Sequence, residues 1–143
     1  MSLKIRFINK TDYEPGLARG EITLHEFVEE FESSLALWNA ERYERQWQEG
    51  IERLRHGAAS SCLITSVWAS PRDSDCDVFG VWWKLYRVGE RVVVQNQLLL
   101  SSVFGREFDP DDPYRSIPER RSVNAEGVQV SEWTVEFDSI GCD

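Results

Sequence analysis

The sequence predicts an α+β domain, in which about five mainly antiparallel strands form a sheet and two helices from the N-terminal half pack on one face. Three observations lead to this prediction. Two aromatic and aliphatic runs flank a glycine-containing turn within 78–100, apolar residues recur at helical spacing over 24–54, and β-rich runs stand near both ends. Antiparallel strands with helices gathered on one face define the α+β class. A chain of 143 residues suits one domain, so 1–143 is assigned to a single domain.

The N-terminal segments are predicted to be a strand, a loop and a first helix. Apolar and basic residues alternate over 3–8, as in a half-buried strand, and 9–20 contains proline and glycines typical of a loop. Thr23 and Glu26 have the spacing of a capping box, which predicts a helix start. The apolar residues that follow at helical spacing are Leu24, Phe27, Val28, Phe31, Leu35 and Trp38.

A second helix is predicted to begin after Asn39, a favourable N-cap residue, and to end at Gly57. One bent helix across both segments is nearly as consistent with the pattern. Gly50 lies inside the second helix, where glycine costs about 1 kcal/mol relative to alanine, so it marks a kink or a close packing point. The predicted buried stripe consists of Tyr43, Trp47, Ile51 and Leu54.

The hairpin within 78–100 is the feature around which the rest of the chain is arranged. With Gly89 and Glu90 as a two-residue turn, Val88 lies opposite Arg91 and the strand register is fixed. One face of the hairpin is then apolar and belongs to the core. The other face is either a second core layer or a surface for a partner, and it carries Gly80, Trp82, Lys84, Tyr86, Val93, Gln95, Gln97 and Leu99.

Two more strands and one long connection complete the predicted fold. The β-branched and aromatic content of 61–69 and 128–137 predicts strands, with a bulge near Ser131 where the apolar phase changes. Between the hairpin and the last strand, 101–121 contains three prolines and many charges. It is predicted to be an irregular connection, and loops of that length in small domains are usually functional or mobile.

The charge balance limits the kind of partner. With 16 basic and 25 acidic side chains the net charge is −9, which disfavours nucleic acid and anionic membranes but suits a basic protein partner. No apolar run reaches the roughly 20 residues of a membrane span, and no secretory signal is visible. We therefore expect a cytoplasmic protein whose three cysteines are reduced.

Catalytic and metal-binding motifs are incomplete. The segment starting at His25 resembles the metalloprotease H-E-x-x-H pattern, but Glu29 stands where the second histidine is required. Asp73, Asp75 and Asp77 alternate as in a calcium loop, without the glycine and glutamate that such a loop needs. The sequence therefore predicts no metal, no cofactor and no enzymatic activity.

Several short patterns resemble immunity proteins of bacterial contact-dependent growth inhibition systems. They are Glu26-Phe27, Ser34-Leu35, Trp38, Tyr43, Gln46-Trp47, Arg53-Leu54, Ser61-x-Leu63-Ile64-Thr65-Ser66, Trp83-x-Leu85-Tyr86, Gln95-Asn96-Gln97-Leu98-Leu99, Ile117-Pro118-x-Arg120 and Ser131-Glu132-Trp133. The resemblance implies a cytoplasmic antidote that binds the C-terminal toxin domain delivered by a neighbouring cell, often a nuclease. It transfers no functional-residue motif.

Under this interpretation, acidic side chains and exposed aromatic residues would contact a basic toxin domain. An alternative is a small-ligand-binding or enzymatic domain, with a pocket between helices and sheet and His25 or His56 as its titratable group. A general adaptor without a toxin partner is a third possibility. The candidate toxin-binding residues are Glu26, Glu29, Glu30, Trp82, Tyr86, Asp109, Asp111 and Asp112.

Overall fold

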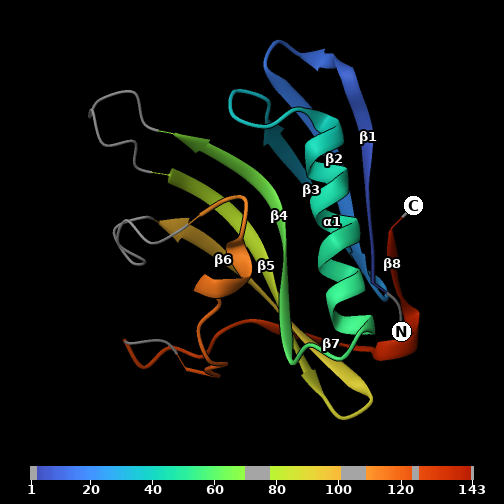
Figure 1. Cartoon of the computed structure of the whole chain (residues 1–143), viewed down its shortest axis with the longest axis vertical. Coiled ribbons are helices and arrows are strands. Elements are labelled where there is room, and N and C mark those ends of the chain that lie inside the picture. The colour runs from blue at the N-terminus through green and yellow to red at the C-terminus, as the bar shows by residue number, and fades with distance from the viewer. Residues whose placement is uncertain (1–2, 70–77, 101–108, 124–125, 143) are drawn as a thin grey trace.

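A computed structural model describes residues 3–69, 78–100, 109–123 and 126–142. Within this part, eight strands form two four-stranded sheets, beside which lies one α-helix (Figure 1). The first sheet has the order β3-β2-β1-β8, and its strands are β1 (Leu3–Glu14), β2 (Leu17–Leu24), β3 (Phe27–Ser34) and β8 (Ile140–Cys142). The second sheet has the order β4-β5-β6-β7, and its strands are β4 (Ser60–Ala69), β5 (Val78–Val88), β6 (Arg91–Leu100) and β7 (Glu132–Glu136). The helix α1 spans Ala40–Arg55, and short 3₁₀ helices span Pro113–Ser116 and Phe137–Ser139.

The predicted first helix is wrong, and with it the predicted fold class of one sheet of about five strands under two helices. Residues 17–34 form the β2–β3 hairpin, in which Leu24 pairs with Phe27 across a two-residue turn. His25 has a φ of 60° in this turn, a backbone conformation that short loops between strands require. Along β2 every second residue is buried, so the alternation of 17–24 decides the structure over the helical spacing.

The two ends of the chain also differ from the prediction. The expected loop over 9–20 is wrong, because β1 continues to Glu14 and a turn at Pro15 and Gly16 leads directly into β2. The last predicted strand, 128–137, is shorter, since β7 begins only at Glu132. The chain then adds β8, which pairs in parallel with the start of β1.

The local predictions for the central hairpin and the helix are confirmed. β5 and β6 pair as expected, with Val88 opposite Arg91, and Gly89 in the turn has a φ of 64°. The Asn39 side chain accepts a hydrogen bond from the Arg42 N–H at 2.8 Å, which caps α1. The predicted stripe of the helix is buried, and consists of Tyr43, Trp47, Ile51 and Leu54.

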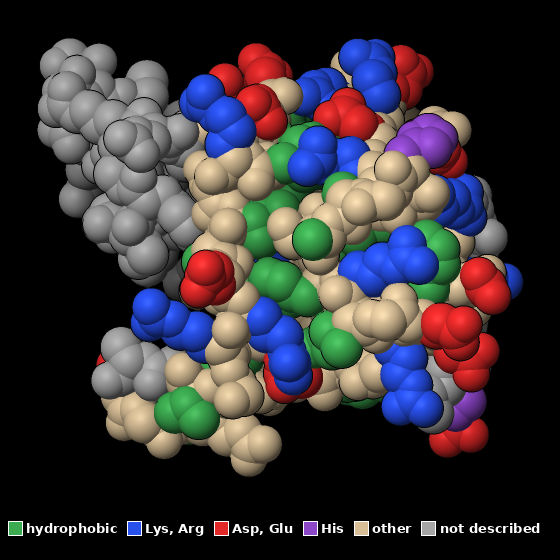
Figure 2. Space-filling model, turned by 60° about the horizontal axis from the view of Figure 1, so that its bottom comes forward, with side chains coloured by type: hydrophobic (Ala, Val, Ile, Leu, Met, Phe, Trp, Pro, Cys, Tyr) green, Lys and Arg blue, Asp and Glu red, His purple; other side chains and the backbone are tan. Residues whose placement is uncertain are grey.

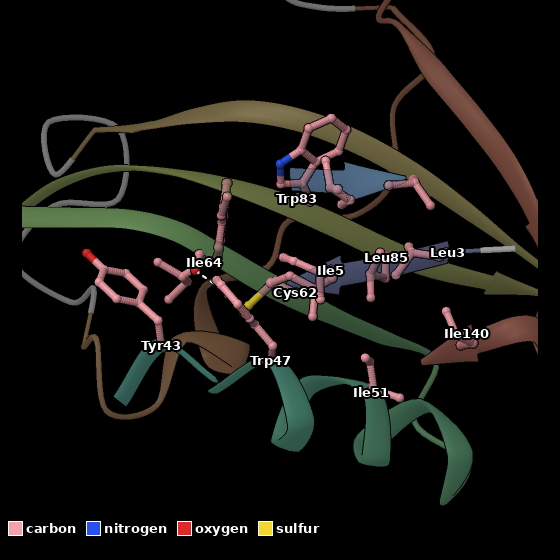
Figure 3. Packing of buried hydrophobic residues seen from close by; sticks show 14 of the residues in the cluster. Leu3, Ile5, Tyr43, Trp47, Ile51, Cys62, Ile64, Trp83, Leu85 and Ile140 are labelled. Carbon is pink, nitrogen blue, oxygen red and sulfur yellow. Dashed lines mark hydrogen bonds between the residues drawn. The ribbon is translucent and has the colours of Figure 1, made fainter. Parts of the chain in front are cut away.

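The helix joins the two sheets by covering the free edge of β4. The Gln46 amide donates to the Cys62 carbonyl at 2.9 Å and accepts from the Ile64 N–H at 2.7 Å. The Trp47 indole donates to the Ile64 carbonyl at 2.7 Å, as Figure 3 shows. These side chains satisfy backbone groups that a neighbouring strand would otherwise pair, so α1 protects an edge that could aggregate.

The other side of α1 packs on the first sheet. The Phe7 ring lies 4.7 Å from the Trp47 ring and 6.1 Å from the Tyr43 ring, between centroids. Phe31 meets Trp47 edge to face at 5.7 Å. Offset and edge-to-face contacts of this kind are favourable beyond the area they bury. The core therefore lies where α1 meets both sheets, and it contains the fully buried Cys62, whose thiol pKa is raised by burial.

Candidate protein-binding surface

The mixed face of the β5–β6 hairpin is a second core layer. Residues 113–121, which we call the strap, cross this face, and the Tyr86 hydroxyl donates to the Pro118 carbonyl at 2.9 Å. Trp82 has no exposed surface and Tyr86 is 7% exposed. The choice between a core layer and a partner surface is thereby decided. Neither candidate aromatic anchor presents surface to a partner in this structure.

Polar contacts fasten the strap to the second sheet. Arg120 forms a bidentate ion pair with Glu132 at 2.8 and 3.0 Å, and this hydrogen bonding lowers the pKa of the Glu132 carboxyl. The buried Gln95 amide donates to the Arg121 carbonyl at 3.0 Å and to Glu132 at 2.7 Å. Lys84 lies beneath the strap at 6% exposure, and burial lowers its ammonium pKa. Buried polar groups paired in this way hold a loop in one position.

Two buried tyrosines predict a loss of stability at alkaline pH. Burial raises the pKa of Tyr43 and of Tyr86 from 10.0 to about 12 in the folded chain. Above pH 10 the unfolded state releases phenolic protons that the folded state keeps, so the free energy of unfolding falls as pH rises from 10 to 12. We expect a decrease of roughly 2 to 4 kcal/mol over that range, measured by urea unfolding.

A matched variant separates this effect from the titration of other groups. Tyr86→Phe keeps the ring but removes one phenol, so the decrease between pH 10 and 12 should be less steep. A decrease should remain, because burial also raises the pKa of Tyr43, of Tyr114 and of the Cys62 thiol. An unchanged slope in this variant would show that the Tyr86 phenol does not contribute.

The acidic candidates on the predicted helix lie instead on the β2–β3 hairpin. Glu26 is exposed in the turn, and Glu30 points away from the core with its side chain 57% exposed. Arg19 on β2 approaches Glu30 at 3.6 Å. Glu29 points inward, where its carboxylate accepts a hydrogen bond from Asn96 at 3.4 Å. Only two of these three carboxylates are therefore on the open surface.

The second acidic group forms a turn beside the start of α1. The Asp109 carboxylate accepts a hydrogen bond from the Asp111 N–H at 2.9 Å, which shapes the turn. Asp111 is 80% exposed and pairs with Arg42 at 3.2 Å, whereas Asp112 pairs with Arg115 at 3.4 Å. Among the described residues, no hydrogen bond or ion pair joins this turn to the β2–β3 hairpin.

A shallow cavity of about 380 Å³ opens between this turn and the helix start. Arg42 stacks on the Trp38 ring at 4.3 Å, so its guanidinium is held between an aromatic face and Asp111. Leu37 adds apolar surface at 44% exposure. The cavity is lined by Leu37, Trp38, Asn39, Arg42, Pro110 and Asp111. Aromatic, aliphatic and charged groups together are typical of protein interfaces.

The outer face of the first sheet carries a charge pattern that the sequence interpretation missed. β1 contributes basic side chains and β3 contributes acidic ones, and Arg6 pairs with Glu21 across β1 and β2 at 2.6 Å. Figure 2 shows one face of the molecule on which Lys and Arg are interspersed with Asp and Glu. The alternation of charged and apolar residues over 3–8 indicates the basic strand, whereas the helical spacing over 24–38 hides the acidic one.

The groups proposed for alternative chemistry are scattered. His25 is exposed in the β2–β3 turn and the His56 side chain is 78% exposed at the end of α1, so neither lines a pocket between helix and sheet. No cluster of three metal-binding side chains exists within 3–69, 78–100, 109–123 and 126–142. Asp73, Asp75 and Asp77 lie outside the described residues. None of the described helices is long and apolar enough to cross a membrane.

Two packed sheets with one edge-covering helix define a fold that is known from a toxin and immunity complex. The structure resembles a chain of the CdiA-CT/CdiI toxin and immunity complex from Enterobacter cloacae, with a TM-score of 0.76 and 23% sequence identity. The similarity covers 94% of this chain and 90% of that chain.

Sequence comparison then gives the family. The model of the CdiI N-terminal domain matches residues 33–142, and this protein belongs to that family. A curated relative, immunity protein CdiI of Enterobacter cloacae subsp. cloacae, is 25% identical over 120 residues, which are 83% of this chain and 79% of the relative. The resemblance noted from the sequence is confirmed.

Proposed function

We propose that this protein is an immunity protein that binds and neutralises the C-terminal toxin domain of a contact-dependent growth inhibition system. Membership of the CdiI N-terminal domain family is the observation that carries the proposal. The curated relative is named an immunity protein, and the similar solved chain comes from a toxin and immunity complex. Neutralisation is by stoichiometric binding without catalysis, in the cytoplasm of the cell that makes the protein.

The toxin domain is proposed to be a basic protein with nuclease activity. A nuclease must attract phosphates, so the surface around its substrate cleft is positively charged. The net charge of −9 on this chain would steer such a domain toward it and speed association. An acidic surface that covers the cleft would also exclude the nucleic-acid substrate.

Growth rescue tests the function directly. The proposed function implies a neighbouring gene for a large secreted protein, and the probe is the C-terminal domain of that protein, expressed from an inducible promoter. We expect that domain alone to stop growth, and co-expression of this protein to restore it, with both proteins co-purifying in a 1:1 ratio. Continued inhibition with full expression of this protein would contradict the proposal.

We propose the exposed carboxylates as contacts for the toxin domain. Glu26, Glu30, Asp111 and Asp112 are candidates because their positions leave charge at the surface. Asp109 is half-buried and is a candidate because its carboxylate shapes the turn that presents Asp111. Glu29 is half-buried, so its proposed contribution to the toxin-binding surface is to support that surface from β3. Trp82 and Tyr86 support the surface from within the core: Trp82 has no exposed surface, and the Tyr86 hydroxyl is bonded to Pro118 of the strap.

Charge reversal at the acidic turn tests this surface. In the double variant Asp111→Lys and Asp112→Lys, the association rate with the toxin domain should fall by roughly tenfold at low salt, and its salt dependence should become weaker. Stopped-flow fluorescence over a range of ionic strengths measures both. The double variant Glu136→Lys and Asp138→Lys provides the matched control, because it changes the net charge by the same amount at two other exposed positions. Equal rates for the acidic-turn variant and the wild type would remove the turn from the interface.

A further inference from the structure

Across the described ranges of the chain, the first sheet ends at β3, and along its outer edge no backbone pairing to another described strand is present. In an antiparallel pair, successive residues of an edge strand direct their N–H and C=O alternately toward the neighbour and away from it. Leu24 and Phe27 flank a two-residue turn and therefore form a hydrogen-bonded pair. Counting from this pair along the unbroken β2–β3 register, Val28, Glu30 and Glu32 direct their backbone groups away from β2.

A hydrogen bond at the far end of β3 supports this alternation. Ser34 lies an even number of residues from Val28, Glu30 and Glu32, so its N–H should also point away from β2. This N–H is bonded to the Ser66 hydroxyl of β4 at 3.1 Å and not to β2. Within the described residues, no strand follows β3 in the sheet order. Val28 is 53% exposed, and Glu30 and Glu32 are exposed as well. The described part of the chain thus leaves three consecutive outward-facing pairing positions open.

The second sheet continues beneath this edge and provides a floor. The Ser34 N–H at the end of β3 bonds to Ser66 of β4, and Ser66 pairs with Val81 of β5. The outer edge of β3 therefore lies near Ser66 and Val81 of the second sheet. Val81 lies on the same face of β5 as the core residue Trp83, but it is only half-buried. An additional strand beside β3 would cover Val81 and extend the packing of the two sheets.

We propose that the outer edge of β3 accepts an extended segment of the toxin domain as a fifth strand of the first sheet. This inference rests on the proposed function and adds the binding mode. A residue paired with Glu30 or Glu32 has its side chain on the same outer face, so lysine or arginine is favoured at both positions. Opposite Val28 an apolar residue fits. The intervening side chains face the floor at Val81, so the segment alternates basic and apolar residues.

The carboxylates of Glu30 and Glu32 make only weak contacts within this structure and can pair with a cationic partner. Glu30 has one cationic neighbour, Arg19, at 3.6 Å, and Glu32 accepts a hydrogen bond from the Tyr13 hydroxyl at 3.3 Å. Both are long contacts at an exposed surface, where ion pairs contribute little. A basic strand could therefore pair with Glu30 and Glu32 while its backbone bonds to β3, a recognition mode in which main-chain bonds give affinity and side chains give specificity.

Amide hydrogen exchange, measured by NMR on the full chain with and without the toxin domain, tests the inference residue by residue. In the free protein the amides of Val28, Glu30 and Glu32 should exchange fast, whereas those of Glu29 and Phe31 bond to β2 and exchange slowly. In the complex the first three should slow by about tenfold or more. Unchanged exchange at these three amides in a formed complex would overturn the inference and leave the proposed function intact. Failure to form any complex would overturn both.

A backbone variant gives a second test. Glu30→Pro removes the outward N–H without removing a bond to β2, a placement that edge strands tolerate. Glu30→Gln is the matched control, since it removes the same charge but keeps the N–H. We expect Glu30→Pro to bind the toxin domain about tenfold more weakly than Glu30→Gln. Equal affinities would show that no strand pairs there. If Glu30→Pro fails to fold, the exchange pattern of the wild type decides.

Discussion

Replacement of Gln46 by leucine is expected to lower the free energy of unfolding by about 3 kcal/mol. The side chain is 1% exposed, and both ends of its amide are used by the edge of β4. Leucine has a similar size and helix propensity, so the helix itself should tolerate the change. The cost comes from the Cys62 carbonyl and the Ile64 N–H, which lose their partner in a place that water does not reach.

The Gln46→Leu variant should also remove a hydrogen bond that holds the start of the strap. The Gln46 amide also donates to the Tyr114 hydroxyl at 3.3 Å, at the start of the strap. Urea unfolding measures the stability, and Gln48→Leu is the control because Gln48 is an exposed residue of α1. Gln48→Leu should change the stability by less than about 0.5 kcal/mol. Similar stabilities for the two variants would show that water replaces the amide and that the helix does not protect the edge.

The elements predicted correctly are those whose deciding contacts lie close together in the sequence, and the others depend on contacts between distant residues. The β5–β6 register depends on a two-residue turn, and the start of α1 depends on the Asn39 cap. Both are decided within a few residues, so the sequence contains the full signal. The stripe of α1 is similarly explicit, since Tyr43, Trp47 and Leu54 repeat at helical spacing without competition from a strand pattern.

The 24–38 segment was ambiguous, and tertiary contacts decided it. Glu26 follows Thr23 at capping-box spacing, yet β2 offers eight residues of strict alternation with which Phe27–Ser34 can pair. Phe31 packs closely over Gly20 of β2, a contact between residues on different strands that no local propensity includes. The helix propensity of 24–38 is outweighed by strand pairing, because only two residues separate Phe27 from the partner strand β2.

For the candidate binding surface, the sequence predicts which residue types are present but not which of them are exposed together. Charge and loop composition identified Asp111 and Asp112 as exposed acids, and the structure places both at the surface. Periodicity could not show that the strap covers Tyr86, because the strap lies more than twenty residues further along the chain. The open edge of β3 was invisible for the same reason, since an edge is a property of the sheet order.

Replacement of Gly50 by alanine should destabilise the protein, against the usual effect of this substitution in a helix. In an exposed helix interior alanine gains about 1 kcal/mol over glycine. Here the added methyl group would meet the Cys62 carbonyl of β4 and approach Leu63 Cδ2 at 3.2 Å. The obstacle is the backbone of β4 and not a flexible side chain, so the helix must move away from β4. Gly50 therefore marks a close packing point, one of the two roles that the sequence left open.

The expected net loss is about 2 kcal/mol, because a displaced helix also weakens the bonds from Gln46 and Trp47 to β4. Urea unfolding measures it, with Gln48→Ala as the control at a nearby exposed position of α1. That control should stay within about 0.5 kcal/mol of the wild type. Both variants place alanine in the same turn of α1, but only position 50 faces β4, so a loss confined to Gly50→Ala comes from the contact with β4. A Gly50→Ala protein more stable than the wild type would mean that α1 lies further from β4 than the structure places it, and that helix propensity alone controls this position.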